Sequence, residues 1–229
     1  MSKQETIESL GLLPHYDLFI NGEFTPSTNP ENKCTAKSPV DGTVLSTFAD
    51  ASKEDVDKAV NCAWEAFKTW KNTTPQERSK VLLAIADAID KNCEKLAKIE
   101  SMDNGKPIRE TMAVDIPSAA NHFRYFAACI VADEGSANVL DEKYLSIILR
   151  EPIGVVGQII PWNYPFLMGA LKLAPVLAAG CCTIIKPSSE TSLSILELAR
   201  IIKDIIPKGV FNVITGRGSK KWSIYFRPS

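Results

Sequence analysis

The 229-residue sequence lacks any imbalance of charge, since 26 Lys and Arg residues face 27 Asp and Glu residues and the net charge is −1. Nucleic acid and anionic membranes select positively charged partners, so this balance indicates neither of them. A long hydrophobic run is missing too. The longest, residues 166–183, is interrupted by Lys172 and Pro175 and is too short to span a membrane. The first five residues contain no apolar signal core, so we expect a soluble, cytoplasmic protein.

Spacings typical of metal ligands are also absent. With only two histidines, His15 and His122, and no Cys-x-x-Cys pair, the sequence indicates no metal site. Reduced, mostly buried thiols are expected at Cys34, Cys62, Cys93, Cys129, Cys181 and Cys182. The adjacent pair Cys181 and Cys182 leads into an apolar strand with no base nearby in sequence. We therefore interpret the pair as packing residues rather than as nucleophiles.

What the sequence does contain is enough apolar material for one or two domains, with 45% hydrophobic residues. In residues 17–24, the dipeptide Asn21-Gly22 separates two short apolar segments and predicts a β-hairpin. Two helix starts are predicted by capping boxes, which pair Ser52 with Asp55 and Thr74 with Glu77. The helix that follows Thr74 is expected to run to Asn104-Gly105. A third helical region covers roughly residues 107–132 and is expected to be disturbed near Pro117.

Strands and helices alternate from Ile153 onward, which predicts an α/β fold with a parallel, doubly wound sheet. Strands are expected at residues 155–160, 182–185 and 210–215, and helices at 167–179 and 192–205. The sheet is incomplete, because dinucleotide folds usually have five or six strands. We expect an exposed edge after strand 210–215, which argues against independent folding of the chain.

Polar residues follow two of these strands, at the edge where an open parallel sheet holds its ligand. After the first strand comes Pro-Trp-Asn-Tyr-Pro, residues 161–165, and after the second comes Lys-Pro-Ser-Ser-Glu, residues 186–190. The side chain of Asn163 can donate hydrogen bonds to a developing oxyanion, although an Asx turn beside the prolines is an alternative role. The ammonium of Lys186 can serve a nucleotide, although strand-end lysines are more often solvated.

Together these two motifs resemble the aldehyde dehydrogenase superfamily, and the resemblance extends from about Asp17 to Ser219. It implies that Asn163 helps to hold a thiohemiacetal oxyanion, that Lys186 reaches the adenosine ribose and that Gly216 lets the backbone approach the adenine. The cofactor-binding residues implied by the resemblance are Ile159, Pro161, Trp162, Lys186, Ser188, Ser189, Glu190 and Gly216. For Trp162, packing of the turn is an alternative role. The sequence has no Gly-x-Gly-x-x-Gly, which fits this family.

The resemblance implies a nicotinamide cofactor but leaves NAD and NADP both open. NAD-preferring members commonly have a glutamate three residues after the lysine, where it binds both ribose hydroxyls and repels a 2′-phosphate. This sequence has Ser189 at that position and Glu190 one residue later. The serine removes the repulsion, whereas Glu190 would favour NAD if it turned inward.

The family's catalytic cysteine and the Glu-Leu-Gly-Gly-Lys segment with its general base do not occur in this sequence. Three interpretations are therefore open: an aldehyde dehydrogenase that oxidises an aldehyde to a carboxylic acid through a cysteine thiohemiacetal, a nucleotide-binding fragment, or a non-functional product. A strand at residues 145–149 corresponds to the family's oligomerisation hairpin, whose partner strands are not expected here. Homo-oligomers are thus implied for the family rather than for this chain.

The expected organisation has five parts. They are an N-terminal hairpin arm at 1–50, a helical part of the cofactor domain at 51–143, an oligomerisation-type strand at 144–152, the first half of the dinucleotide sheet at 153–219 and an aberrant tail at 220–229. The tail is aromatic and basic, without a helical or turn pattern. One inserted adenine after the Ser219 codon would convert a family-like continuation into this tail, so we hypothesise a frameshift.

Overall fold

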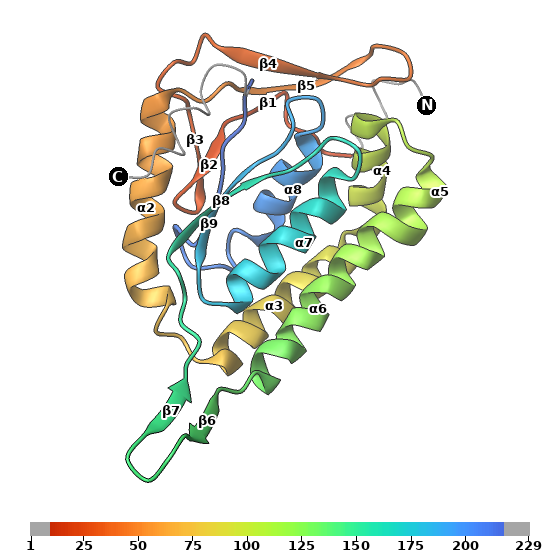
Figure 1. Cartoon of the computed structure of the whole chain (residues 1–229). Helices are drawn as coiled ribbons and strands as arrows, with labels where there is room; N and C mark the ends of the chain where they lie inside the picture. The colour runs from red at the N-terminus through yellow and green to blue at the C-terminus, as the bar shows by residue number, and fades with distance from the viewer. Residues whose placement is uncertain (1–9, 218–229) are drawn as a thin grey trace.

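The computed structural model describes residues 10–217, and the hypothetical frameshifted tail lies outside them (Figure 1). Its main sheet contains three parallel strands, in which β8 pairs with β9 and β9 pairs with β10. The bounds are Val155–Ile159 for β8, Cys182–Lys186 for β9 and Phe211–Val213 for β10. Helices cover both faces of this sheet, which confirms the predicted doubly wound α/β class.

The predicted N-terminal hairpin is present and extends the main sheet. Strands β2 (Leu18–Ile20) and β3 (Glu23–Thr25) are joined by Asn21 and Gly22, whose φ angles of 57° and 81° suit a tight hairpin turn. Strand β2 pairs antiparallel with β10, so the strand order is β3-β2-β10-β9-β8. The prediction of an exposed edge after strand 210–215 is therefore wrong, because a distant segment covers it.

Three layers enclose the core. Helix α2 (Lys53–Trp70) covers one face of the sheet, and α7 (Pro165–Ala178) with α8 (Leu193–Ile202) covers the other. Helices α3 (Pro75–Lys91) and α6 (Ile116–Ala132) pack outside α7 (Figure 1). Apolar side chains between the helical layers are almost fully buried, among them Leu82, Phe123 and Phe166.

Both predicted capping boxes are formed, at the starts of α2 and α3. The single helix predicted after Thr74 is wrong, because the chain leaves the helical conformation at Asn92, where φ is −109° and ψ is 15°. The Asn92 side chain donates to the carbonyl of Ala88, a local bond that competes with helix continuation. Helix α4 (Cys93–Asn104) follows and ends at Gly105, whose φ is 86°.

The third helical region is irregular where the sequence indicates. A short α5 (Ile108–Glu110) leads into a π-helical turn (Thr111–Asp115), and α6 begins directly after it. Pro117, the second residue of α6, follows helical residues directly and is not at a free helix start. Its missing N–H cannot donate to a carbonyl of the π-helical turn before it, which fits the irregular hydrogen bonding there.

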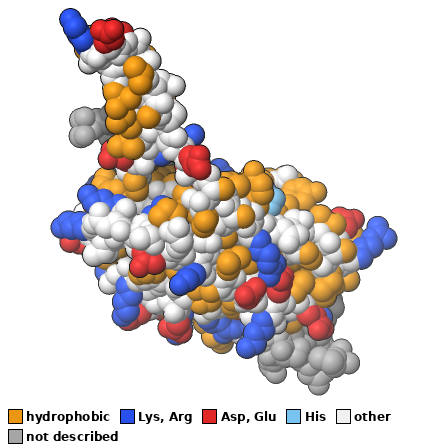
Figure 2. All heavy atoms as spheres, turned by 90° about the horizontal axis from the view of Figure 1, so that it is seen from below, with side chains coloured by type: hydrophobic (Ala, Val, Ile, Leu, Met, Phe, Trp, Pro, Cys, Tyr) orange, Lys and Arg blue, Asp and Glu red, His pale blue; other side chains and the backbone are white. Residues whose placement is uncertain are grey.

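Two small sheets complete the fold. The first has the order β1-β5-β4, with β1 at His15–Tyr16, β4 at Lys33–Lys37 and β5 at Val44–Ala49. The second is an arm that projects from the body, formed by β6 (Ser136–Val139) and β7 (Leu145–Ile148), with apolar side chains along its exposed surface (Figure 2). The expectation that strand 145–149 lacks a partner is thus wrong.

Candidate functional site

The candidate site lies at the carboxyl ends of β8, β9 and β10. Ile159 is in register with Lys186, and the backbone N–H of Ile160 donates to the carbonyl of Lys186 at 3.0 Å. On the other side, the N–H of Ile214 donates to the carbonyl of Ile185, also at 3.0 Å. The structure therefore brings the segments 159–163, 186–190 and 214–216 to one edge of the sheet, as the sequence predicts.

Lys186 is buried, with 8% of its surface exposed, so the alternative of a solvated strand-end lysine is wrong. Its Nζ donates to the carbonyl of Pro187 at 2.7 Å. Burial lowers the pKa of this ammonium, and the nearby Cys34 and Asp50 act in the opposite direction. A cation is thus held at the end of β9, between the main sheet and the β1-β5-β4 sheet.

Gly216 lies where the chain after β10 meets the end of β5. Its φ of 133° is unfavourable for other residues, and a Cβ there would collide with the carboxylate of Asp50. The same carboxylate accepts the backbone N–H of Arg217 at 3.2 Å, and Ala51 N–H donates to Thr215 at 2.9 Å. A glycine is therefore required by packing, whatever ligand approaches the backbone.

The turn that carries Asn163 is exposed, and its backbone is held by a residue of another element, α4. Asn163 faces solvent, and an Asx turn is disfavoured because Pro165, two residues later, has no N–H to donate. Trp162 is 63% exposed, which contradicts the alternative role of packing the turn. Its carbonyl accepts a 2.6 Å hydrogen bond from Nδ2 of Asn104.

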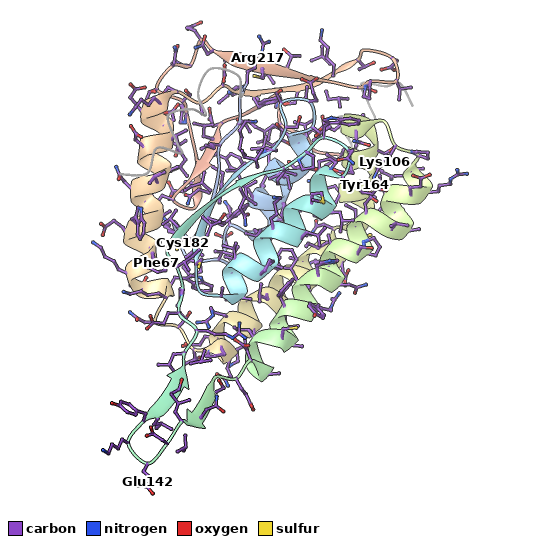
Figure 3. The ribbon with its side chains drawn as sticks, in the orientation of Figure 1. Phe67, Lys106, Glu142, Tyr164, Cys182 and Arg217 are labelled. Carbon is purple, nitrogen blue, oxygen red and sulfur yellow. The ribbon has the colours of Figure 1, made fainter. Side chains whose placement is uncertain are left out.

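A cation–π contact supports the same turn. Nζ of Lys106 lies 3.1 Å from the ring centroid of Tyr164 and 2.7 Å from Oδ2 of the buried Asp115 (Figure 3). Pro161 and Tyr164 are exposed, like Trp162 and Asn163. The turn thus presents its side chains outward, while Asn104 at the end of α4 holds its backbone and Lys106 holds the ring of Tyr164.

The loop after β9 contains the residues that bear on cofactor choice. Oγ of Ser189 donates to Oε1 of Glu190 at 3.2 Å, and the N–H of Glu190 donates to Oγ of Ser188 at 3.2 Å. Ser188 and Ser189 are half-buried and Glu190 is exposed. Ser189 and Glu190, the two residues that bear on the choice between NAD and NADP, are therefore hydrogen-bonded to each other.

Other polar groups have structural roles. Cys181 and Cys182 are buried, and burial raises the pKa of the Cys182 thiol to about 12, as expected of a packing residue. Over residues 10–217, no group of three or more His, Cys, Asp or Glu side chains could hold a metal ion. In the same range, no helix is long and apolar enough to cross a bilayer.

Sequence reasoning missed the residues that support the site from α4 and the loop after it: Glu100, Asp103, Asn104 and Lys106. A signal for two of them was present. Glu100 and Asp103 continue the helical spacing of Leu96 and Ile99, so they fall on the buried face of α4, where acids are rare.

Comparison with known proteins agrees with this geometry. Residues 24–222 match the aldehyde dehydrogenase family. An aldehyde dehydrogenase of Vibrio cholerae serotype O1 is 52% identical over 205 residues, and an acetaldehyde dehydrogenase of Pseudomonas aeruginosa is 50% identical over 205 residues. Each alignment covers 90% of this chain and 40% of the relative. The crystal structure of PnpE in complex with nicotinamide adenine dinucleotide is 40% identical, with a TM-score of 0.86 over 89% of this chain and 42% of that one.

The chain therefore spans about 40% of the length of the curated relatives it matches. The match covers most of the chain, including every strand and helix that forms the candidate site. This protein belongs to the aldehyde dehydrogenase family.

Proposed function

We propose that this chain is the N-terminal, cofactor-holding portion of an NAD(P)-dependent aldehyde dehydrogenase. The reaction proposed for the whole enzyme oxidises an aldehyde to a carboxylic acid through a cysteine thiohemiacetal. The observation that carries the proposal is the buried ammonium of Lys186 at the carboxyl end of β9, beside the ends of β8 and β10. In this portion, residues 51–143 would form the helical part of the cofactor domain and residues 153–219 the first half of its dinucleotide-binding sheet.

Each proposed role follows from the chemistry of the side chain. Lys186 would donate to the ribose hydroxyls of the adenosine half, and the serines and Glu190 of the same loop would line that ribose. Asn163, exposed on its turn, would donate to an oxyanion without adding charge. Ile159, Pro161 and Trp162 would contact the cofactor along β8, and Gly216 would leave room for the adenine. The nicotinamide cofactor itself supplies the hydride acceptor.

The chain alone is proposed to bind nucleotide without oxidising aldehydes. Its sequence contains neither the family's catalytic cysteine nor the Glu-Leu-Gly-Gly-Lys segment. Without a nucleophile, only residual rates from positioning and oxyanion donors are expected. The arm formed by β6 and β7 is proposed as the surface where copies associate, since Val139, Leu145 and Ile147 expose 77%, 60% and 59% of their surface.

Equilibrium dialysis of the purified chain with NAD⁺, NADP⁺ and AMP tests this function. Lys186→Met keeps the length and burial of the side chain but removes its charge. We expect it to weaken binding of all three ligands by about 10- to 100-fold, the effect of one or two charged hydrogen bonds. Lys208→Met is the matched control, because Lys208 is exposed and pairs only with Glu23 at 2.6 Å among the described residues. Equal affinities for wild type and Lys186→Met would refute the proposed role.

A further inference from the structure

Helix α4 packs against α7 and α8 at the ends where these two helices begin (Figure 1). Two of its acids are almost completely buried there, Glu100 at 0% and Asp103 at 1% exposure. The backbone N–H of Phe166, in α7, donates to Oε1 of Glu100 at 3.1 Å. The N–H of Leu193, the first residue of α8, donates to Oδ2 of Asp103 at 2.9 Å.

These two bonds replace the local caps that α7 and α8 lack. The first N–H groups of any helix have no partner within the helix. In α2 and α3, Ser52 and Thr74 supply that partner from the preceding residue. At the start of α7 and α8, Tyr164 and Ser192 make no side-chain cap bond. Both helices that follow the ligand-bearing loops are thus capped by one other helix, α4.

The two caps are spaced by the geometry of α4. Residues three apart lie on one helix face, about 5–6 Å from each other. The start of α7 and the start of α8 are therefore held at a separation that one rigid turn of α4 determines. The turn 161–164 directly precedes the first start, and the loop 186–190 is separated from the second by Thr191 and Ser192.

Further contacts tie α4 to the turn and to α8. On the side of the turn, Asn104 binds the carbonyl of Trp162. On the side of α8, Nζ of Lys95 lies 2.8 Å from Oε2 of the buried Glu197. Burial disfavours the charged form of both acids and raises the pKa of Glu100 to about 7 and that of Asp103 to about 8. Burying an ionisable group in this way lowers the stability of the folded state unless its hydrogen bonds compensate.

We propose that Glu100 and Asp103 are positioning residues of the cofactor site, and that α4 thereby sets the spacing between the turn with Asn163 and the loop with Lys186. This inference rests on the proposed function. Neither acid contacts the cofactor. Glu100 acts on the turn that carries Asn163, the proposed oxyanion donor, and Asp103 acts on the side of Lys186, the proposed ligand of the adenosine ribose.

The proposal assigns a different ligand profile to each acid. Asp103→Ala should weaken AMP and NAD⁺ binding equally, by about tenfold, the loss expected for one cap bond. Glu100→Ala should weaken NAD⁺ by a similar factor and leave AMP unchanged. Glu100→Gln and Asp103→Asn keep an acceptor oxygen at the same position and should restore most of the affinity.

Amide hydrogen exchange provides a readout that does not depend on ligand. Glu100 also interacts with Ser194 in the first turn of α8, so the readout is the two capped amides themselves. Exchange at the N–H of Phe166 should accelerate most in Glu100→Ala, and exchange at the N–H of Leu193 most in Asp103→Ala. If the two substitutions accelerate both amides equally, or if the Gln and Asn variants behave like the Ala variants, the positioning role is overturned. A wild-type chain that binds no nucleotide would defeat the proposed function, while the exchange pattern would still decide whether α4 sets the helix starts.

A milder variant covers the case in which the alanine variants do not fold. Asn104 lies at the end of α4 and is only partly buried, so Asn104→Ala should fold normally. It removes the bond to Trp162 and should weaken NAD⁺ but not AMP, the profile expected for Glu100→Ala. An unchanged NAD⁺ affinity, or an equal loss for AMP, would contradict positioning of the turn from α4.

Discussion

Replacing Gly216 with alanine should destabilise the protein through two separable effects. The first is conformational, because a residue with a Cβ is strained at a φ of 133°. Such strain costs on the order of 1–3 kcal/mol. The second is steric, because the new Cβ would collide with the carboxylate of Asp50 and approach the backbone nitrogen of Ala51 to 3.2 Å. Displacing Asp50 would also break its bond to Arg217, which adds about 1 kcal/mol.

The expected total is therefore about 2–4 kcal/mol in the free energy of unfolding, measured by urea denaturation. A double-mutant cycle with Asp50→Ala separates the effects. In the Asp50→Ala background, Gly216→Ala should cost less, since the collision with the carboxylate is gone and only the strain and the close approach to the nitrogen of Ala51 remain. Gly42→Ala is the matched control: its φ is 73° and no atom lies within 4 Å of an added Cβ, so its cost should be about 1 kcal/mol. Additive costs of Gly216→Ala and Asp50→Ala would refute the steric argument.

Three further predictions concern charge. Burial raises the pKa of Glu100 from 4.5 to about 7 and that of Asp103 from 3.8 to about 8. The folded state therefore binds more protons than the unfolded state between about pH 4 and pH 8, so the free energy of unfolding should fall as the pH rises through this range. Urea denaturation across this range should show that fall in wild type and lose it in Glu100→Gln/Asp103→Asn; an equal slope in both would contradict it. Glu197→Ala should lower the unfolding free energy by about 3–5 kcal/mol, because the buried carboxylate binds Tyr16, Lys95 and Arg200. The control is Glu94→Ala, which removes the exposed partner of Lys98 and should change the free energy of unfolding little. Ser189→Glu should shift the ratio of NADP⁺ to NAD⁺ affinity by about tenfold against NADP⁺, as repulsion of the 2′-phosphate requires; an unchanged ratio in competition dialysis would exclude that mechanism.

The sequence predicted those parts of the fold that local signals specify. The Asn21-Gly22 hairpin and both capping boxes depend on residues within a few positions of each other, and all three are formed. The alternation of strands and helices after Ile153 has the same local character. At the site, the ends of β8 and β9 were predicted because parallel strands place them at one edge.

Long-range contacts were not predictable in this way. Nothing near Leu18–Ile20 indicates that this strand covers the edge of β10, and the sequence reasoning left that edge exposed. The strand Ser136–Val139 is short, polar at its start and fully exposed, so it lacks the alternation that reveals most strands. Glu100 and Asp103 were missed because their partners are backbone groups of other helices, which a sequence pattern does not name.

The covering of β10 by the N-terminal hairpin has a consequence for the order of folding. Oδ1 of the buried Asn212 accepts the N–H of Asn21, which lies 191 residues earlier in the chain. During synthesis, the hairpin would wait roughly 10–40 s for this partner at ordinary elongation rates. Closing so long a loop costs roughly 5 kcal/mol in chain entropy, so the hairpin should dock late, once β9 and β10 have paired. The apolar strand Leu18–Ile20 is thus exposed to chaperones and proteases for most of the time in which the chain is made.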